Sequence, residues 1–411
     1  MLITRTTLMR ACGAGLVLLA SQHAVSAAAA ADPAALMGEY DRAVRQVEAQ
    51  DETIVRAADT LAAAVVDGAA LAVAGSTPVR LDAMNRPGAM LATHAAPGAG
   101  DAVVYVLEDS APAVAGTERI EALAAAGSTV VVLAAWDADV ADTLRGRVHA
   151  AASAVIEIES GASLRPALTL TAFWALQPDL FAACTRPGET PIVQRCETLD
   201  PAGRRAWRYG ERRFHHDLWL DPIPPGRAAR AYLDHARTLA LDLRTVSGDA
   251  LDEAAWRCGI AARDGGTVWL TAGARLVFAS RYLPGGPTGV MRPWSWNPRT
   301  GAGPAAVDDV VIAVGGVDPP SWTWWREIDA MRDAGLGVVW VQPGHFVDRD
   351  RLAARDVLLD TQTPFGDACV KAAGYDTRLG PLSSLATELV LACLAEATAA
   401  GQATSVYSAP R

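Results

Sequence analysis

The chain contains an internal repeat, and this feature restricts its fold more than any other. Asp67–Gly68 precedes an apolar run, and Asp264–Gly265 precedes a similar run 197 positions later. The same offset aligns Pro87–Gly88 with Pro284–Gly285. Self-similarity at a fixed spacing indicates two copies of one structural unit.

A second block repeats at a longer offset. Residues 101–104 match residues 309–312, which lie 208 positions further along the chain. The longer offset places an insertion in the second copy, near 285–306, where Gly, Pro and Trp are frequent. We therefore expect a first domain over 34–184 and a second over 229–411.

Each copy contains short apolar runs separated by stretches with helical periodicity. The expected strands lie near 70–75, 102–107, 129–134 and 154–158, and near 267–272, 309–314, 337–342 and 356–360. Short continuous apolar runs are typical of parallel strands that are covered on both faces. The pattern predicts an α/β fold of two tandem, doubly wound αβα sandwiches of flavodoxin-like type, each with a parallel sheet.

The N-terminus has the features of a Sec-type signal peptide over residues 1–30. Arg5 and Arg10 precede a short apolar run, and small residues around Ala27 offer a cleavage site. The alternative is an uncleaved N-terminal anchor. No later segment is expected to reach the length and apolarity of a transmembrane helix, so the predicted location is the periplasm or the exterior of the cell.

Charge and composition exclude several classes of function. The net charge of −10 disfavours nucleic-acid binding. The only lysine is Lys371, and no cofactor or metal motif was found. Among the cysteines, we expect Cys184 and Cys196 to form a disulfide, and Cys258 and Cys393 to be inert core residues.

The segment 185–228 connects the two copies and is rich in Arg, Pro and aromatic residues. It is either a linker that packs across both domains or an anion- or partner-binding surface. The sequence leaves both interpretations open.

The C-terminal part of the chain resembles a known family. Residues 356–360, 363–368 and 379–384 are similar to the end of sugar isomerase (SIS) domains, most of all to an uncharacterised SIS group related to phosphoheptose isomerases. Residues 308–314 and 331–341 are similar to strands of that family. Specific motifs are confined to the last part of the chain.

The resemblance implies a sugar or sugar-phosphate ligand at the carboxyl ends of the strands, held by short hydroxyl side chains and backbone N–H groups. The expected ligand-binding residues are Ser76, Thr77, Arg80, Ser110, Arg275, Asp318, Asp367, Ser383 and Ser384.

This sequence departs from the family pattern at these loops. The second loop of copy one carries Glu108 and Asp109, whose charges would repel a phosphate, and copy two has few hydroxyls. The candidates for a general base, none of them in a specific motif, are Glu108, Asp109, His94, His345 and Glu388. The tryptophans of copy two either stack on a sugar or fill the interface between the copies.

Taken together, these features predict an exported tandem SIS-like protein that binds a sugar or sugar derivative, with degenerate or no isomerase activity. The alternatives are an active phosphosugar or amino-sugar isomerase or lyase, and a non-catalytic partner-binding module. A homo-oligomer is compatible with each of them.

Overall fold

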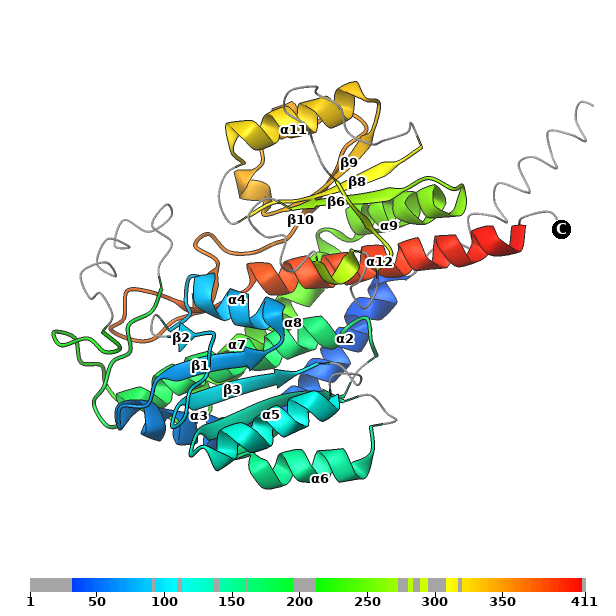
Figure 1. Ribbon diagram of the computed structural model, residues 1–411. Coiled ribbons are helices and arrows are strands. Elements are labelled where there is room, and N and C mark those ends of the chain that lie inside the picture. The colour runs from blue at the N-terminus through cyan, green and yellow to red at the C-terminus, as the bar shows by residue number, and fades with distance from the viewer. Residues whose placement is uncertain are drawn as a thin grey trace, which may run out of the picture.

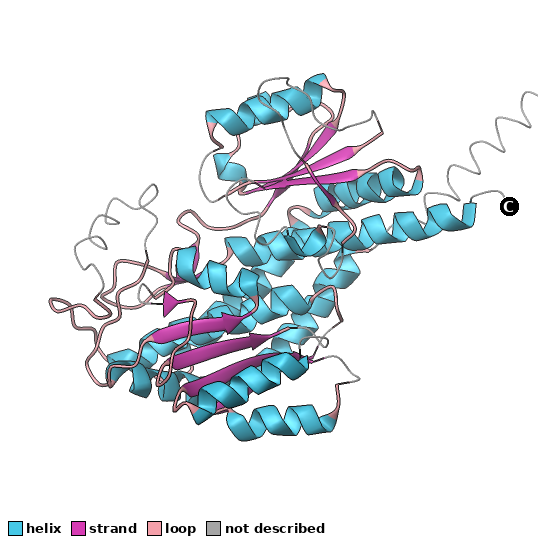
Figure 2. Cartoon of the chain, in the orientation of Figure 1, coloured by secondary structure: helices cyan, strands magenta, loops and turns pink. Residues whose placement is uncertain are grey.

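The structure contains two five-stranded parallel sheets (Figures 1 and 2). The computed structural model describes residues 32–408, with gaps at 91–92, 109–112, 137–139, 160, 195–211, 273–279, 284–288, 295–307 and 317–319. The predicted signal peptide and most of the predicted insertion therefore lie outside the described residues.

The first sheet has the order β2-β1-β3-β4-β5, and every neighbouring pair is parallel. Its strands are β1 (Leu71–Gly75), β2 (Thr93–His94), β3 (Ala102–Leu107), β4 (Thr129–Trp136) and β5 (Ala154–Glu159). Four of them match the apolar runs expected from the sequence. The edge strand β2 was not expected, because two residues carry no readable pattern.

The second sheet has the order β10-β9-β8-β6-β7, again parallel throughout. Its strands are β6 (Val268–Ala272), β7 (Arg292–Pro293), β8 (Val310–Val314), β9 (Gly337–Gln342) and β10 (Val357–Asp360). Counted from its own first strand, this is the order of the first sheet. The doubly wound α/β class expected from the sequence is thus present twice.

Helices surround both sheets. Those of the first half are α2 (Pro33–Glu48), α3 (Asp51–Val66), α4 (Thr77–Asn85), α5 (Ala113–Ala125), α6 (Asp142–Ala151) and α7 (Arg165–Thr185). Those of the second half are α8 (Arg227–Thr245), α9 (Gly248–Arg263), α11 (Trp322–Asp333) and α12 (Ser383–Ser408). A short antiparallel pair, β11 (Ala368–Val370) and β12 (Leu379–Pro381), precedes α12.

The layers follow one another in a fixed order, which Figure 1 shows from bottom to top. Helices α5 and α6 cover the outer face of the first sheet, and α11 covers the outer face of the second. Between the sheets lie α2, α3, α7, α8, α9 and α12. One continuous hydrophobic cluster joins the inner faces of both sheets through these helices. We call these six helices the central helix layer.

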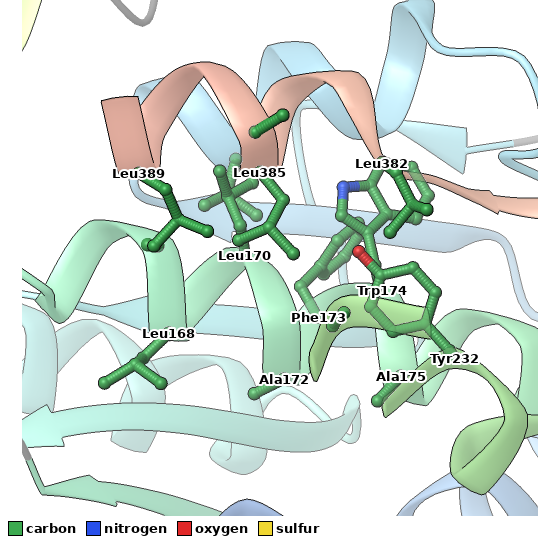
Figure 3. Packing of buried hydrophobic residues seen from close by; sticks show 14 of the residues in the cluster. Leu168, Leu170, Ala172, Phe173, Trp174, Ala175, Tyr232, Leu382, Leu385 and Leu389 are labelled. Carbon is green, nitrogen blue, oxygen red and sulfur yellow. The ribbon is translucent and has the colours of Figure 1, made fainter. Parts of the chain in front are cut away.

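The helices α7 and α12 are the most deeply buried members of this layer. Figure 3 shows Leu170 and Trp174 of α7 beside Leu385 of α12, with Tyr232 of α8 nearby. Their side chains are all fully buried. A helix enclosed on every side needs no polar face, and this explains why both sequences are apolar nearly all round.

The burial of α12 corrects one expectation. The stretch Ser383–Thr404 is long and apolar enough to cross a membrane, whereas the sequence analysis expects no later segment of that length and apolarity. In the folded chain, 78% of its 18-residue window is buried inside the protein. Its composition therefore reflects a core position within the central helix layer.

Cysteine and tryptophan positions correct two more expectations. Cys184 is a free, buried thiol whose pKa burial raises to about 12, and its expected partner Cys196 lies outside the described residues. Cys258 and Cys393 are buried, as expected. Trp325 of α11 packs with Trp294 and Trp340 on the outer face of the second sheet, together with Trp269. For these tryptophans, placement between the copies was therefore wrong.

We predict that Gly75→Ala lowers the free energy of unfolding by roughly 3 kcal/mol or more. Gly75 has φ +86°, and an added Cβ would collide with the carbonyl oxygen of Val106 on the neighbouring strand. Gly127→Ala is the matched control, because Gly127 has φ +83° but open space around its Cα. That variant should lose only about 1 kcal/mol, from backbone strain. Equal losses in urea titrations would contradict the steric argument.

Candidate functional site

Two strands of the first sheet end beside each other and begin the candidate site. Strand β1 ends at Gly75, and Ser76 follows as the residue that precedes α4. Strand β3 pairs with β1 and is followed by Glu108. Ligands of open α/β sheets bind at this carboxyl edge, so both side chains lie where a ligand is expected.

An arginine from the second half of the chain reaches this edge. Arg281 lies in the 3₁₀ turn η2 (Ser280–Tyr282) and is 7% exposed. Its Nη2 donates to Ser76 Oγ at 3.2 Å and to both Glu108 carboxylate oxygens at 2.9 and 2.8 Å. The charge of Glu108, expected to repel a phosphate, is therefore paired within the protein.

A second carboxylate lies on the other side of Arg281. Glu388 is on α12, its side chain is 0% exposed, and its Oε1 lies 4.0 Å from Arg281 Nε. Its Oε2 accepts a hydrogen bond from the Tyr282 hydroxyl at 2.8 Å. Its Oε1 has no hydrogen-bond partner among the described residues. Glu108, Arg281 and Glu388 thus form a buried triad, which we call the bridging triad.

Burial dominates the electrostatics of the triad. Loss of hydration raises the pKa of Glu388 to about 7, although Arg281 and the Tyr282 hydroxyl oppose the shift. The carboxylates of Glu108 and Asp82 add to the rise. Burial acts to lower the pKa of Arg281, but the two glutamates outweigh it and hold the pKa above its usual range.

Further polar groups flank the triad. Arg165, at the start of α7, donates from Nη1 to the backbone oxygen of Glu108 at 3.4 Å. Arg80 lies on the first turn of α4 and approaches Thr77 Oγ1 at 3.5 Å. Its Nε is buried without a hydrogen-bond partner among the described residues. The edge therefore combines guanidinium groups with two hydroxyls, a set that suits an anionic group.

A second buried polar cluster adjoins the first and also joins the two halves of the chain. Asp82 of α4 accepts from Ser384 Oγ of α12 at 2.7 Å and from Trp174 Nε1 of α7 at 2.9 Å. It also accepts from Arg86, with which it forms a buried ion pair. Burial raises the pKa of Asp82 in spite of these partners.

The N-terminus of α12 is held by a carboxylate of the protein itself. Asp367 Oδ1 accepts from the backbone N–H groups of Leu382 at 3.2 Å and Ser383 at 2.7 Å. Ser383 Oγ accepts from Arg86 at 3.2 Å. The positions at which we expected Asp367, Ser383 and Ser384 to contact a ligand are thus filled by internal contacts at a buried surface.

The remaining residues that we expected to bind a ligand fall into two groups, those at the first-sheet edge and those outside the described residues. Ser76, Thr77 and Arg80 lie together at the first-sheet edge with the bridging triad. Ser110, Arg275 and Asp318 lie outside the described residues. Within the part of the chain that the structure describes, no three His, Cys, Asp or Glu side chains are grouped to hold a metal ion.

Sequence reasoning missed the central member of the site. The 197-residue offset aligns Arg281 and Tyr282 with Met84 and Asn85 of the first copy. Arg281 is a charged residue where the first copy has a methionine, and this difference could have marked it as a candidate site residue. Nothing in the sequence pattern, however, indicates that its side chain reaches the first sheet. Glu388 was considered only as an isolated candidate base.

Comparisons with known proteins give similarity in structure alone. No family model and no curated protein matches the chain. A protein described as sugar-binding, from Salmonella typhimurium LT2, is similar over 86% of this chain and 98% of its own, with 14% identity and TM-score 0.43. The C-terminal domain of glucosamine-fructose-6-phosphate aminotransferase from Francisella tularensis is similar over 90% and 95%, with 10% identity and TM-score 0.49. A protein described as a phosphosugar isomerase, from Silicibacter pomeroyi DSS-3, is similar over 90% and 97%, with 13% identity and TM-score 0.41.

We predict that Glu388 makes stability fall as pH rises. Its pKa is about 7 in the folded protein and 4.5 as the ordinary value, so the folded state binds more protons between these limits. The contribution of Glu388 to the free energy of unfolding should decline by up to about 1.4 kcal/mol for each unit by which the pH rises between these two values. Glu388→Gln should remove this decline in urea titrations at pH 4.5 to 7.5, with Glu396→Gln on the same helix as control. Parallel profiles for wild type and Glu388→Gln would contradict the assignment.

Proposed function

We propose that the protein binds a sugar or sugar derivative carrying an anionic group, at the carboxyl edge of the first sheet, with little or no isomerase activity. One observation carries the proposal: Arg281 joins Ser76 and Glu108 at the ends of two adjacent strands. The site is thereby completed by the second half of the chain. The sequence resemblance to SIS domains supports a phosphosugar or related ligand.

The chemistry of the edge fits this class of ligand. Ser76 and Thr77 offer hydroxyls, and Arg80 has a buried Nε without a hydrogen-bond partner among the described residues. Guanidinium groups bind phosphate or carboxylate through paired N–H donors. The bridging triad behind them positions the Ser76 hydroxyl, to which Arg281 Nη2 donates at 3.2 Å.

The same geometry argues for binding over turnover. A general base must reach the proton that it removes. Glu108 accepts both of its short contacts from Arg281, and Glu388 is fully buried and bonded to Tyr282. Among the described residues, both candidate carboxylates at this edge are therefore already engaged within the protein; the candidate Asp109 lies outside the described residues.

The second candidate function is an active sugar-phosphate isomerase. It is favoured by the pKa of Glu388, about 7, which suits a group that both takes and gives a proton at neutral pH. In that case ligand binding would have to free Glu388 from Tyr282.

We predict that Arg80→Met weakens binding of a sugar phosphate about tenfold or more, because it removes a charged partner of the anion. Isothermal titration against six- and seven-carbon sugar phosphates and their unphosphorylated parents measures the effect. Arg56→Met, which removes an exposed arginine on α3, is the matched control.

The outcomes of this titration separate the alternatives. Binding of a sugar phosphate that is weakened in Arg80→Met, with no conversion of that sugar phosphate by the protein, supports the proposal. Interconversion of a sugar phosphate, followed by proton NMR, would replace it with the isomerase. No binding of any compound would favour a partner-binding module.

We further propose that the protein is exported through its N-terminal segment. The basic residues, apolar run and small residues of 1–30 support this. Expression of the full chain in a bacterial host should yield a periplasmic product whose N-terminus, measured by mass spectrometry, lies near residues 28–30. A full-length product in the membrane fraction would indicate an uncleaved anchor instead.

A further inference from the structure

Aromatic side chains gather at the carboxyl edge of the second sheet, away from the bridging triad. Strand β9 ends at Gln342 and leads into the 3₁₀ turn η3 (Gly344–Phe346). Strand β10 pairs with β9, with Asp360 opposite Gln342, and leads into the loop that carries Phe365. Both connections therefore start from the same end of two adjacent strands.

Three rings meet at this edge. The ring centroids of His345 and Phe346 are 4.2 Å apart. The ring of Phe365 lies 5.9 Å from His345 and 6.0 Å from Phe346. Their planes are tilted by 43° to 56°, so the rings form a cluster instead of a parallel stack. We call these three residues the aromatic platform.

The platform is exposed yet held by the backbone. Phe365 is 64% exposed, and His345 is also exposed. Asp360 Oδ1 accepts from the backbone N–H groups of Gly344 at 2.8 Å and Gln362 at 3.0 Å, and so ties the two connections together. A turn closed by Asp367 N–H to Pro364 O at 3.0 Å holds Phe365 at its tip.

The apolar ring of Phe365 stays exposed to solvent in this arrangement. Folding alone favours burial of a phenylalanine, by about 1.5 to 3 kcal/mol relative to exposure. A fixed, exposed ring beside two others is suited to contact the apolar C–H face of a pyranose, while the imidazole of His345 can bond a hydroxyl.

The nearby charges select against an anionic ligand. The carboxylates that hold these loops, Asp348 and Asp360, both accept backbone N–H groups. The Arg351 guanidinium lies 3.9 Å over the ring of Trp325 and bonds Asp329, so it is directed elsewhere. This differs from the first-sheet edge, where Arg80 and Arg281 face two hydroxyls.

We propose that the aromatic platform of His345, Phe346 and Phe365 is a second binding site, which takes a neutral saccharide by stacking. The protein then carries two sites of different chemistry: one for an anionic sugar at the first sheet, and one for an uncharged sugar ring at the second. The second site does not depend on the first.

Phe365→Ala tests this site. Neutral methyl hexosides, N-acetylhexosaminides and their trisaccharides are titrated by calorimetry and examined by saturation-transfer NMR. Phe365→Ala should weaken binding about fivefold to tenfold, because it removes one stacking ring. Phe365→Trp should retain binding. Trp219→Ala is the matched control, because Trp219 is an aromatic residue 70% exposed that lies outside copy two.

Each outcome decides the proposal. Absence of binding for every neutral saccharide, or equal affinity of Phe365→Ala and wild type, would overturn it. Trisaccharides that bind more tightly than monosaccharides would identify a polysaccharide chain as the source of the sugar, and equal affinities would identify free sugar. Arg80→Met should leave this binding unchanged, so failure of the first-sheet site and failure of the platform are distinguishable.

Discussion

The central helix layer is the constraint on which the rest of the structure depends. Both sheets bury one face against it, and a single hydrophobic cluster runs from one sheet to the other. Two αβα units with separate cores would be free to move relative to each other. Here the shared layer fixes them, and this fixed relation allows Arg281 to reach the strand ends of the other half.

Burying the polar groups that connect the two halves of the chain costs free energy, because these groups lose their hydration. The ion pair of Arg281 with Glu108 loses hydration, and such pairs rarely add net stability over apolar packing. This pair and the hydrogen bond from Ser384 to Asp82 each form only in one arrangement of the two halves. The polar contacts therefore specify how the halves dock, while the central helix layer supplies the attraction.

Strands and sheet class were readable from the sequence because apolar runs and helical periodicity are local signals. The eight expected strands match β1, β3, β4, β5, β6, β8, β9 and β10 closely. The contacts of the site are not local. Ser76 and Arg281 are 205 residues apart, and Asp82 and Ser384 are 302 apart, so no window of sequence contains either pair. Ser383 and Ser384 begin α12, and the carboxylates that bond them, Asp367 and Asp82, come from other elements of the fold.

The places of Arg281 and Glu388 in the chain have a consequence for the first half taken alone. The first sheet uses residues up to Glu159 and α7 ends at Thr185, whereas Arg281 and the helix that carries Glu388 follow later. A fragment that ends after α7 would therefore leave the apolar surface of α7 exposed and Glu108 without the Arg281 guanidinium. The first half thus depends on the second both for burial of its helix and for pairing of its charge.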